Sequence, residues 1–295
     1  MTFKNVRLAF LWGLVFTLVH PVFAESPGKP LVLQEMSWTD VRDYLIHNNM
    51  VIIPLGSTEQ HGPHLPLGTD WYAATEASKA ISARTGVMVA PVLQAGYSLY
   101  HSGFPGTLSL KPETMAQVLF ESAQMLIKYG FRRFLFFSYH GGNRIPQETV
   151  ISKINQETEA TAVAIGVGSP IQQSEEEGEF FDWHAGVEET SMMLYLKPEL
   201  VKMDRAQKSI VHFTPQMEEL RELAKTDKEL LAVWNSLFGV PEETKKGGSS
   251  KDLSNNGIWS LSDPKTATAA KGEKIFLNMV ERATKLVEAW KRAKK

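Results

Sequence analysis

The chain contains no cysteine among its 295 residues. Disulfides therefore cannot stabilise it, and a domain of this length must be held together by its hydrophobic core. The absence also excludes a thiolate as nucleophile or metal ligand, because cysteine alone supplies one. Any metal ion that the chain binds must be held by histidine, aspartate and glutamate.

A strong charge of either sign is also lacking. Lysine and arginine together number 31, and aspartate and glutamate together number 33, so the formal net charge is −2. A mildly acidic chain without a basic patch lacks the positive charge that attracts phosphate backbones. We therefore expect no nucleic-acid partner.

Long apolar runs are absent as well, and the longest lies near the N-terminus at residues 8–19. Two basic residues precede this run, and small side chains at Val22 and Ala24 follow it. This order is typical of a cleavable signal peptide, and the run is short for a membrane span. The sequence predicts a signal peptide over 1–24, a domain over 25–295, a secreted or periplasmic location, and no membrane span after cleavage. An uncleaved N-terminal anchor is the alternative.

Short apolar segments alternate with amphipathic segments through most of the chain. The runs of strand length lie at 50–55, 87–92, 133–139 and 161–167. This alternation predicts an α/β fold, a single domain with a mostly parallel central sheet and helices on both faces. Further helices are predicted at 215–238 and 271–294. The Lys/Gly/Ser-rich segment 242–256 is expected to be mobile.

A loop rich in glycine and proline follows the first apolar run and carries residues that bind metals. Glu59 and His61 are two residues apart, so each can reach a different ion in extended backbone. Asp70 opens the next helix, where its two oxygens can bridge those ions. Carboxylate oxygen and imidazole nitrogen together suit Zn²⁺, Mn²⁺ or Fe²⁺. A purely structural loop is the alternative, although loops on a rigid scaffold often carry function.

A second motif, His140-Gly-Gly-Asn143, comes directly after the third apolar run. In open α/β sheets, ligands bind beyond the carboxyl ends of the strands. His140 is therefore expected at the same sheet edge as Glu59, His61 and Asp70. The sequence predicts two divalent metal ions per chain (Zn, Mn or Fe), held by these four side chains and at least one more.

The stretch from Gly56 to Asp70, GSTEQHGPHLPLGTD, resembles the signature of the creatininase (creatinine amidohydrolase) family. The loop at 96–107, with its Phe-Pro-Gly-Thr step, and the segment 256–273 are similar to that family too. The resemblance implies a creatininase-like fold and hydrolysis of an amide bond with the help of two metal ions. It also implies a small-molecule amide substrate and a homo-oligomer, a hexamer.

The resemblance further implies roles for residues near 184. His184 matches the family's general acid/base histidine, and an imidazole can shuttle a proton to a leaving amine near neutral pH. Creatininase carries a carboxylate two residues after the histidine that matches His140, where this chain has Gly142. Glu189 is our candidate for the missing ligand. A structural histidine and a helix-capping carboxylate are the respective alternatives.

Other residues are expected behind the ligands or around the substrate. They are His64, His101, Gly141, Asn143 and Trp183. His64 is expected to orient a ligand through its other ring nitrogen, or to be purely structural. Gly141 replaces an aromatic residue of creatininase, which argues against creatinine itself as the substrate.

We interpret the chain as an exported dinuclear metal-dependent hydrolase of a C–N amide bond, of the cyclic-amide or N-formyl type. Two alternatives stay open: a non-catalytic exported protein that binds a metal or solute on the same fold, and a metal-dependent ester or lactone hydrolase. A serine hydrolase is disfavoured, because the sequence offers Ser57 no obvious partner base.

Overall fold

The computed structural model describes residues 28–166 and 182–293. The signal peptide predicted at 1–24 lies outside these residues, and so does the last residue of the strand predicted at 161–167. Within the described residues, no helix combines the length and the apolar character that a membrane crossing needs.

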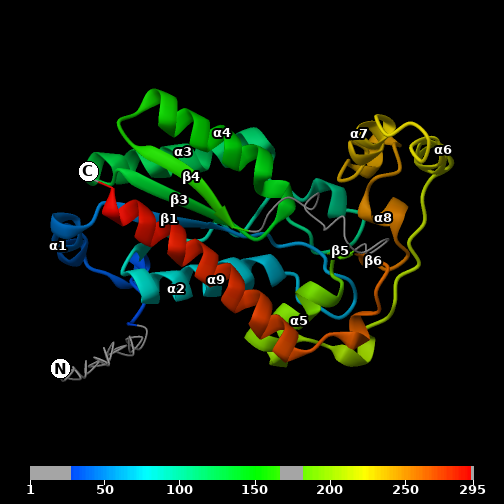
Figure 1. The fold of residues 1–295 in the computed structure, drawn as a ribbon, viewed down its shortest axis with the longest axis horizontal. Helices are drawn as coiled ribbons and strands as arrows, with labels where there is room; N and C mark the ends of the chain where they lie inside the picture. Colours follow the sequence, from blue (N-terminus) through cyan, green and yellow to red (C-terminus); the bar gives the residue numbers. More distant parts are fainter. Residues whose placement is uncertain (1–27, 167–181, 294–295) are drawn as a thin grey trace, which may run out of the picture.

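Four parallel strands form the central sheet in the order β2–β1–β3–β4 (Figure 1). Their bounds are Met50–Leu55 for β1, Met88–Val89 for β2, Arg133–Ser138 for β3 and Thr161–Gly166 for β4. Every residue of β1 is buried, as expected for a parallel strand covered on both faces. The predicted α/β fold with a parallel sheet is confirmed, although β2 is much shorter than the run at 87–92.

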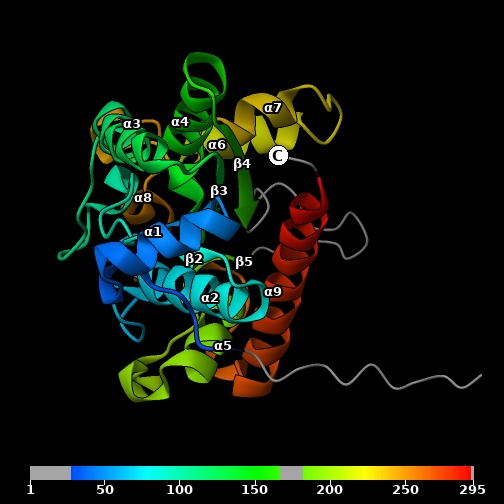
Figure 2. The ribbon, with the colours of Figure 1, turned by 90° about the vertical axis from the view of Figure 1, so that its left-hand side faces the viewer.

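Helices cover both faces of this sheet, as Figure 2 shows. They are α1 (Trp38–His47), α2 (Thr69–Thr85), α3 (Pro112–Tyr129), α4 (Arg144–Glu157), α5 (Val187–Leu196) and α9 (Ala269–Arg292). Side chains alternate between faces along a strand, so Leu135 and Phe137 of β3 pack with α2, α5 and α9. Phe134 and Phe136 point the other way and pack with α3 and α4.

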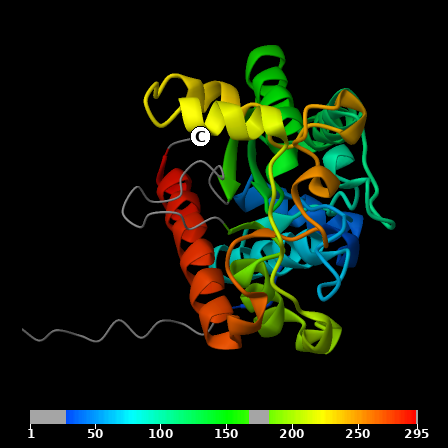
Figure 3. The ribbon, with the colours of Figure 1, turned by 90° about the vertical axis from the view of Figure 1, so that its right-hand side faces the viewer.

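A smaller layer lies beyond the carboxyl ends of the strands, at one end of the molecule in Figure 1 and facing the viewer in Figure 3. It contains a two-stranded antiparallel sheet of β5 (Asp182–His184) and β6 (Trp259–Ser260). It also contains α6 (Pro215–Leu223), α7 (Leu230–Asn235) and α8 (Ser250–Leu253).

The helix predicted at 215–238 is wrong as a single element, because α6 and α7 are separate. The break follows Leu223, where hydrogen bonds between residues three apart interrupt the helical pattern, from the amide of Lys225 to the carbonyl of Glu222 and from Leu230 to Asp227. The turn lets the indole of Trp234 donate to the carbonyl of Met217 at 3.1 Å. The two helices therefore pack as a hairpin.

The segment 242–256, predicted to be mobile, is exposed over residues 242–246 and packs against the domain from residue 247 onward. Residues 247–250 are buried, and Ser249 caps α8 in a reciprocal pair with Asp252. Leu253 is 1% exposed and packs with Tyr100, Met217 and Trp259. Local composition suggested a loop, whereas the cap of α8 and the apolar contacts of Leu253 hold the second half of the segment against the rest of the domain.

Candidate metal centre

Seven ionisable side chains converge where β1 and β3 end. They are Glu59, His61, Asp70, His101, His140, His184 and Glu189. Six of them are at most 7% exposed, and the Glu189 side chain is 18% exposed. The set contains the five predicted metal ligands and the predicted acid/base histidine, so the structure brings together residues from both halves of the chain.

The loop after β1 is held close to the start of α2 and to the turn after β3. A side chain at Gly56 would meet the backbone of Trp71 at 2.6 Å, so only glycine allows this approach. The amide of Glu59 donates to the carbonyl of Leu67 at 2.8 Å and closes the loop. The side-chain amide of Asn143 donates to the carbonyl of Gly56 at 3.0 Å. Asn143 therefore ties the two ligand-bearing loops together.

Asp70 lies between two histidines. Nε2 of His61 is 3.3 Å from one carboxylate oxygen of Asp70, and Nδ1 of His140 is 3.2 Å from the other. Glu59 Oε2 is 3.3 Å from His140 Nε2, and Glu189 Oε2 is 3.6 Å from His61 Nε2. The side chains thus form two groups that have Asp70 in common. One contains Glu59 and His140, and the other contains His61 and Glu189.

Backbone carbonyls fix the protonation of His61 and His140. Nδ1 of His61 donates to the carbonyl of Glu59 at 3.1 Å, and Nε2 of His140 donates to the carbonyl of Tyr97 at 2.9 Å. A carbonyl can only accept, so these nitrogens are protonated, and the opposite nitrogen of each ring is the one that can offer a lone pair to a metal ion beside Asp70. Metal-bound histidines are typically held by such carbonyl contacts on their outer nitrogen.

His184 is held in the same way. Its Nε2 lies 2.6 Å from the carbonyl of Gln60 and 3.1 Å from the side-chain amide nitrogen of that residue. The carbonyl contact is shorter and can accept a proton, so the hydrogen is on Nε2. Nδ1 therefore faces the carboxylates, 3.7 Å from Glu59 Oε1 and 3.9 Å from Glu189 Oε2.

The buried charges favour bound cations. Burial opposes ionisation of Asp70, but His61 and His140 lower the pKa of its carboxyl group below the usual range. Burial raises the pKa of Glu189 to about 8, and the neighbouring Asp70 adds to this effect. Among the residues that the structure describes, His61 Nε2 and Asp70 Oδ2 are buried and find no hydrogen-bond partner. Unpaired buried polar atoms are costly, and divalent ions would satisfy them, so these residues fit a metal centre.

The other predicted site residues lie around this centre. His64 does not touch the cluster; its Nε2 lies 2.8 Å from Thr190 Oγ1, beside Glu189 on α5. Trp183 packs edge-on against Phe238, with ring centroids 4.5 Å apart, in the aromatic cluster of the smaller layer. Gly141 is exposed at the start of the turn after β3. His101 lies inside the cluster rather than at a pocket wall.

A side chain at Gly142 has no room. A Cβ atom there would lie 2.1 Å from the carbonyl oxygen of Tyr97 and 2.5 Å from His140 Nε2. The carboxylate that creatininase carries at the matching position therefore cannot be accommodated in this arrangement. Glu189 reaches the centre from α5 instead.

A family model described as creatinine amidohydrolase matches residues 34–287. The chain belongs to the creatininase family. Members of this family are metal-dependent amidohydrolases, and the predictions of family, fold and enzyme class are confirmed.

Individual creatininase-family proteins agree with this assignment. A mycofactocin precursor peptide peptidase from Mycobacterium ulcerans is 32% identical over 250 residues, which are 81% of this chain and 85% of that protein. A creatinine amidohydrolase from Pseudomonas putida is 31% identical over 199 residues, 60% of this chain and 76% of that protein. The solved structure of a manganese creatininase superposes with a TM-score of 0.67 at 24% identity, over 90% of this chain and all of that one.

Sequence reasoning missed several residues of this creatininase-family centre. Gln60, Ser98, Tyr100 and Ser250 are buried against its histidines. In extended backbone Gln60 would point away from the side that Glu59 and His61 share, so its contacts with His101 and His184 were not evident from the sequence. Ser250 offers no signal either, because it comes from a segment whose composition suggests a loop.

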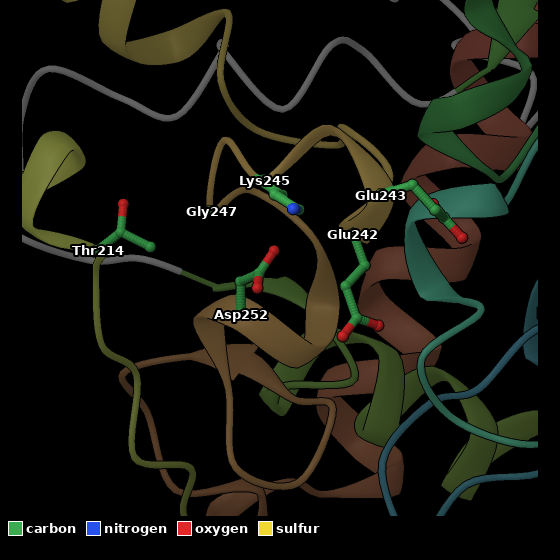
Figure 4. Close-up of a pocket in the computed structure, with 6 residues that line it drawn as sticks. All are labelled: Thr214, Glu242, Glu243, Lys245, Gly247 and Asp252. Atoms are coloured by element: carbon green, nitrogen blue, oxygen red, sulfur yellow. The ribbon is translucent and has the colours of Figure 1, made fainter.

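A cavity of about 520 Å³ opens on the surface of the smaller layer, among Thr214, Glu242, Lys245 and Asp252 (Figure 4). Two of its three carboxylates are already engaged, since Asp252 completes the cap of α8 and Glu242 lies 3.8 Å from the Lys251 ammonium. None of its lining residues belongs to the metal centre. We therefore assign the chemistry to the buried cluster.

Proposed function

We propose that this protein hydrolyses a C–N amide bond with two divalent ions held by Glu59, His61, Asp70, His140 and Glu189. The observation that carries the proposal is the position of Asp70, whose two oxygens face histidines from two different loops. Ions bound there would polarise an amide carbonyl and lower the pKa of water. Zn²⁺, Mn²⁺ and Fe²⁺ suit this mixture of oxygen and nitrogen ligands, and the similar solved structure is a manganese creatininase.

His184 is the proposed proton carrier. The Gln60 carbonyl holds its ring by Nε2, which leaves Nδ1 free to accept a proton and pass it to the leaving nitrogen. Nδ1 is farther from the carboxylates than the inward nitrogens of His61 and His140 are, which favours a proton carrier over a ligand.

Glu189 is the proposed ligand that compensates for Gly142. One of its oxygens accepts a hydrogen bond from the amide of Ala185 at 2.6 Å, where the backbone has a φ of 54°. A left-handed conformation at alanine is unfavourable and persists only where neighbouring contacts enforce it. This turn fixes the direction in which Glu189 faces His61.

The proposed substrates are cyclic amides and N-formyl compounds. Short peptides belong in the same screen, because the 32% identical relative from Mycobacterium ulcerans is named a peptide peptidase. The test is elemental analysis of the purified protein followed by assays on these three classes. Turnover of an amide with about two equivalents of metal supports the proposal. Retained metal with no turnover favours a binding protein, and turnover of lactones alone favours an ester or lactone hydrolase.

Export is a second part of the proposal, and it rests on the signal peptide pattern at 1–24. Mass spectrometry of protein from the periplasm or medium should give a chain that begins at Glu25. A chain that retains residues 1–24 would contradict cleavage. A homo-oligomer is also proposed from the family resemblance, and light scattering after size exclusion measures it directly.

A further inference from the structure

A line of buried polar contacts connects α8 to Glu59. The hydroxyl of Ser250 contacts Nδ1 of His101, and Nε2 of His101 lies 3.2 Å from Oε1 of Glu59. Ser250 and Glu59 are fully buried, and His101 is 2% exposed. We propose that Ser250 and His101 are positioning residues for Glu59, through which the smaller layer sets the affinity of a metal ion. This inference rests on the proposed metal centre.

The side chain of Gln60 determines which way the His101 ring is protonated. Gln60 Oε1 accepts from the amide of Gly62 at 2.9 Å, and Gln60 Nε2 donates to the carbonyl of Gly257 at 3.0 Å. These two backbone groups have fixed roles, so they orient the side-chain amide without ambiguity. Its nitrogen lies 3.2 Å from His101 Nδ1. That nitrogen only donates and Nε2 of His184 is protonated, so the arrangement favours Nδ1 of His101 as an acceptor with the ring hydrogen on Nε2.

His101 therefore differs from His61, His140 and His184, whose inward nitrogens can offer a lone pair to a metal ion. It presents an N–H group toward Glu59 Oε1, an oxygen that is buried without an aligned hydrogen bond. The positive end of the imidazole dipole lies against the carboxylate and stabilises its charge. The other oxygen, Oε2, faces His140 on the side where a metal ion is proposed. His101 thus acts on the ligand and does not act as a ligand itself.

The position of Ser250 is fixed by the packing of α8. The hydroxyl of Ser249 donates to Asp252 Oδ2 at 2.7 Å and accepts from the Asp252 amide at 3.2 Å. A Cβ atom at Gly248 would lie 1.6 Å from the carbonyl oxygen of Leu237, so the turn before α8 lies directly against that backbone. The His101 ring is held from the other side by stacking on His184, with centroids 4.1 Å apart.

The test measures Mn²⁺ binding to metal-free full-length protein by competition with a chelator of known affinity. His101→Ala should still bind two ions, with one of them about 10- to 100-fold weaker, which is the usual effect of losing an outer contact to a ligand. Ser250→Ala should weaken the same ion by a smaller factor, because Ser250 acts on Glu59 only through His101. His101→Gln should recover part of the loss, because an amide can also present an N–H group to Glu59.

Ser254→Ala is the matched control. Ser254 is 2% exposed in the same segment, but its hydroxyl pairs with Ser209 at 2.8 Å, away from the histidines. Its Mn²⁺ affinities should equal those of the wild type. Thermal unfolding of each metal-free variant separates a loss of fold from a loss of affinity, and the two His101 variants decide the matter if Ser250→Ala does not fold.

Two outcomes would overturn the inference while leaving the metal centre intact. One is a Ser250→Ala binding curve that coincides with the wild-type curve. The other is loss of one whole equivalent of Mn²⁺ in His101→Ala, because His101 would then be a ligand. A wild-type protein that binds no Mn²⁺, Zn²⁺ or Fe²⁺ would instead overturn the proposed function and this inference with it.

Discussion

The imidazole of His61 and the carboxylate of Asp70 lie 3.3 Å apart, Nε2 to Oδ1, and neither side chain is more than 2% exposed. Asp70 Oδ2 is turned to His140, so one carboxylate serves both groups of the proposed centre. We expect Asp70→Ala to lose most of both metal ions, because a bridging ligand contributes to each. Elemental analysis of the purified variant measures this loss.

Glu76→Ala is the control for that experiment. Glu76 is a carboxylate on the same helix, 3.2 Å from the Lys197 ammonium and outside the centre, so its removal should leave the metal content unchanged. A full complement of metal in Asp70→Ala would rule out the bridge.

Glu189 can be tested as a metal ligand separately from its role as a helix cap. Glu189→Gln keeps a side-chain oxygen for the Ala185 amide but cannot lose a proton to form the carboxylate that would bind a metal ion beside His61. We expect this variant to unfold near the wild-type temperature and to lose one of two ions. The neighbouring Glu188 is exposed, and Glu188→Gln should keep both ions. Normal metal content in Glu189→Gln would leave Glu189 as a cap alone.

The grouping of the predicted ligands was accessible from sequence for a physical reason. Glu59 and His140 each follow a buried apolar strand, and parallel strands bring their carboxyl ends to one edge. Asp70 begins a helix directly after the glycine- and proline-rich loop, so chain connectivity alone keeps it near Glu59. The positions of Glu59, His140 and Asp70 can therefore be predicted from local sequence patterns and from the way parallel strands align their carboxyl ends.

Contacts between distant segments could not be predicted in this way. Nothing local indicates that β5 pairs with β6, or that Ser250 reaches His101, because each partner is defined only once the smaller layer has folded. The tautomer of His101 depends on the direction of the Gln60 amide, which two distant backbone groups fix. The break between α6 and α7 is a turn in which backbone hydrogen bonds join residues three apart, and helical periodicity does not reveal it.

Gly142 is predicted to tolerate no side chain. Gly142→Ala would push a methyl group against the Tyr97 carbonyl and the ring of His140, so the ring must move. Overpacking of this kind typically costs about 1–3 kcal/mol of unfolding free energy. We expect a lower melting temperature together with weaker metal binding. Gly68→Ala is the control, since its Cβ would meet only the Tyr72 ring at 3.4 Å and its φ of −91° suits alanine. A Gly142→Ala protein with unchanged stability would show that the turn can relax.

The last prediction concerns His184 and distinguishes three roles for it. If His184 carries the proton, His184→Ala should retain two ions and a near-normal melting temperature, and should lose about 10²- to 10⁴-fold in kcat. If His184 is a ligand, one ion should be lost together with activity. If its role is structural, the melting temperature should fall first, because the ring packs between His61 and His101. All three quantities are measured on one preparation, with the amide that the substrate screen identifies.

The control is His212→Ala, whose side chain lies outside the cluster and which should match the wild type in every measurement. An unchanged rate in His184→Ala would remove His184 from the mechanism and leave Glu189 as the next candidate, since its carboxylate is the most exposed of the cluster and faces the same side as His184 Nδ1.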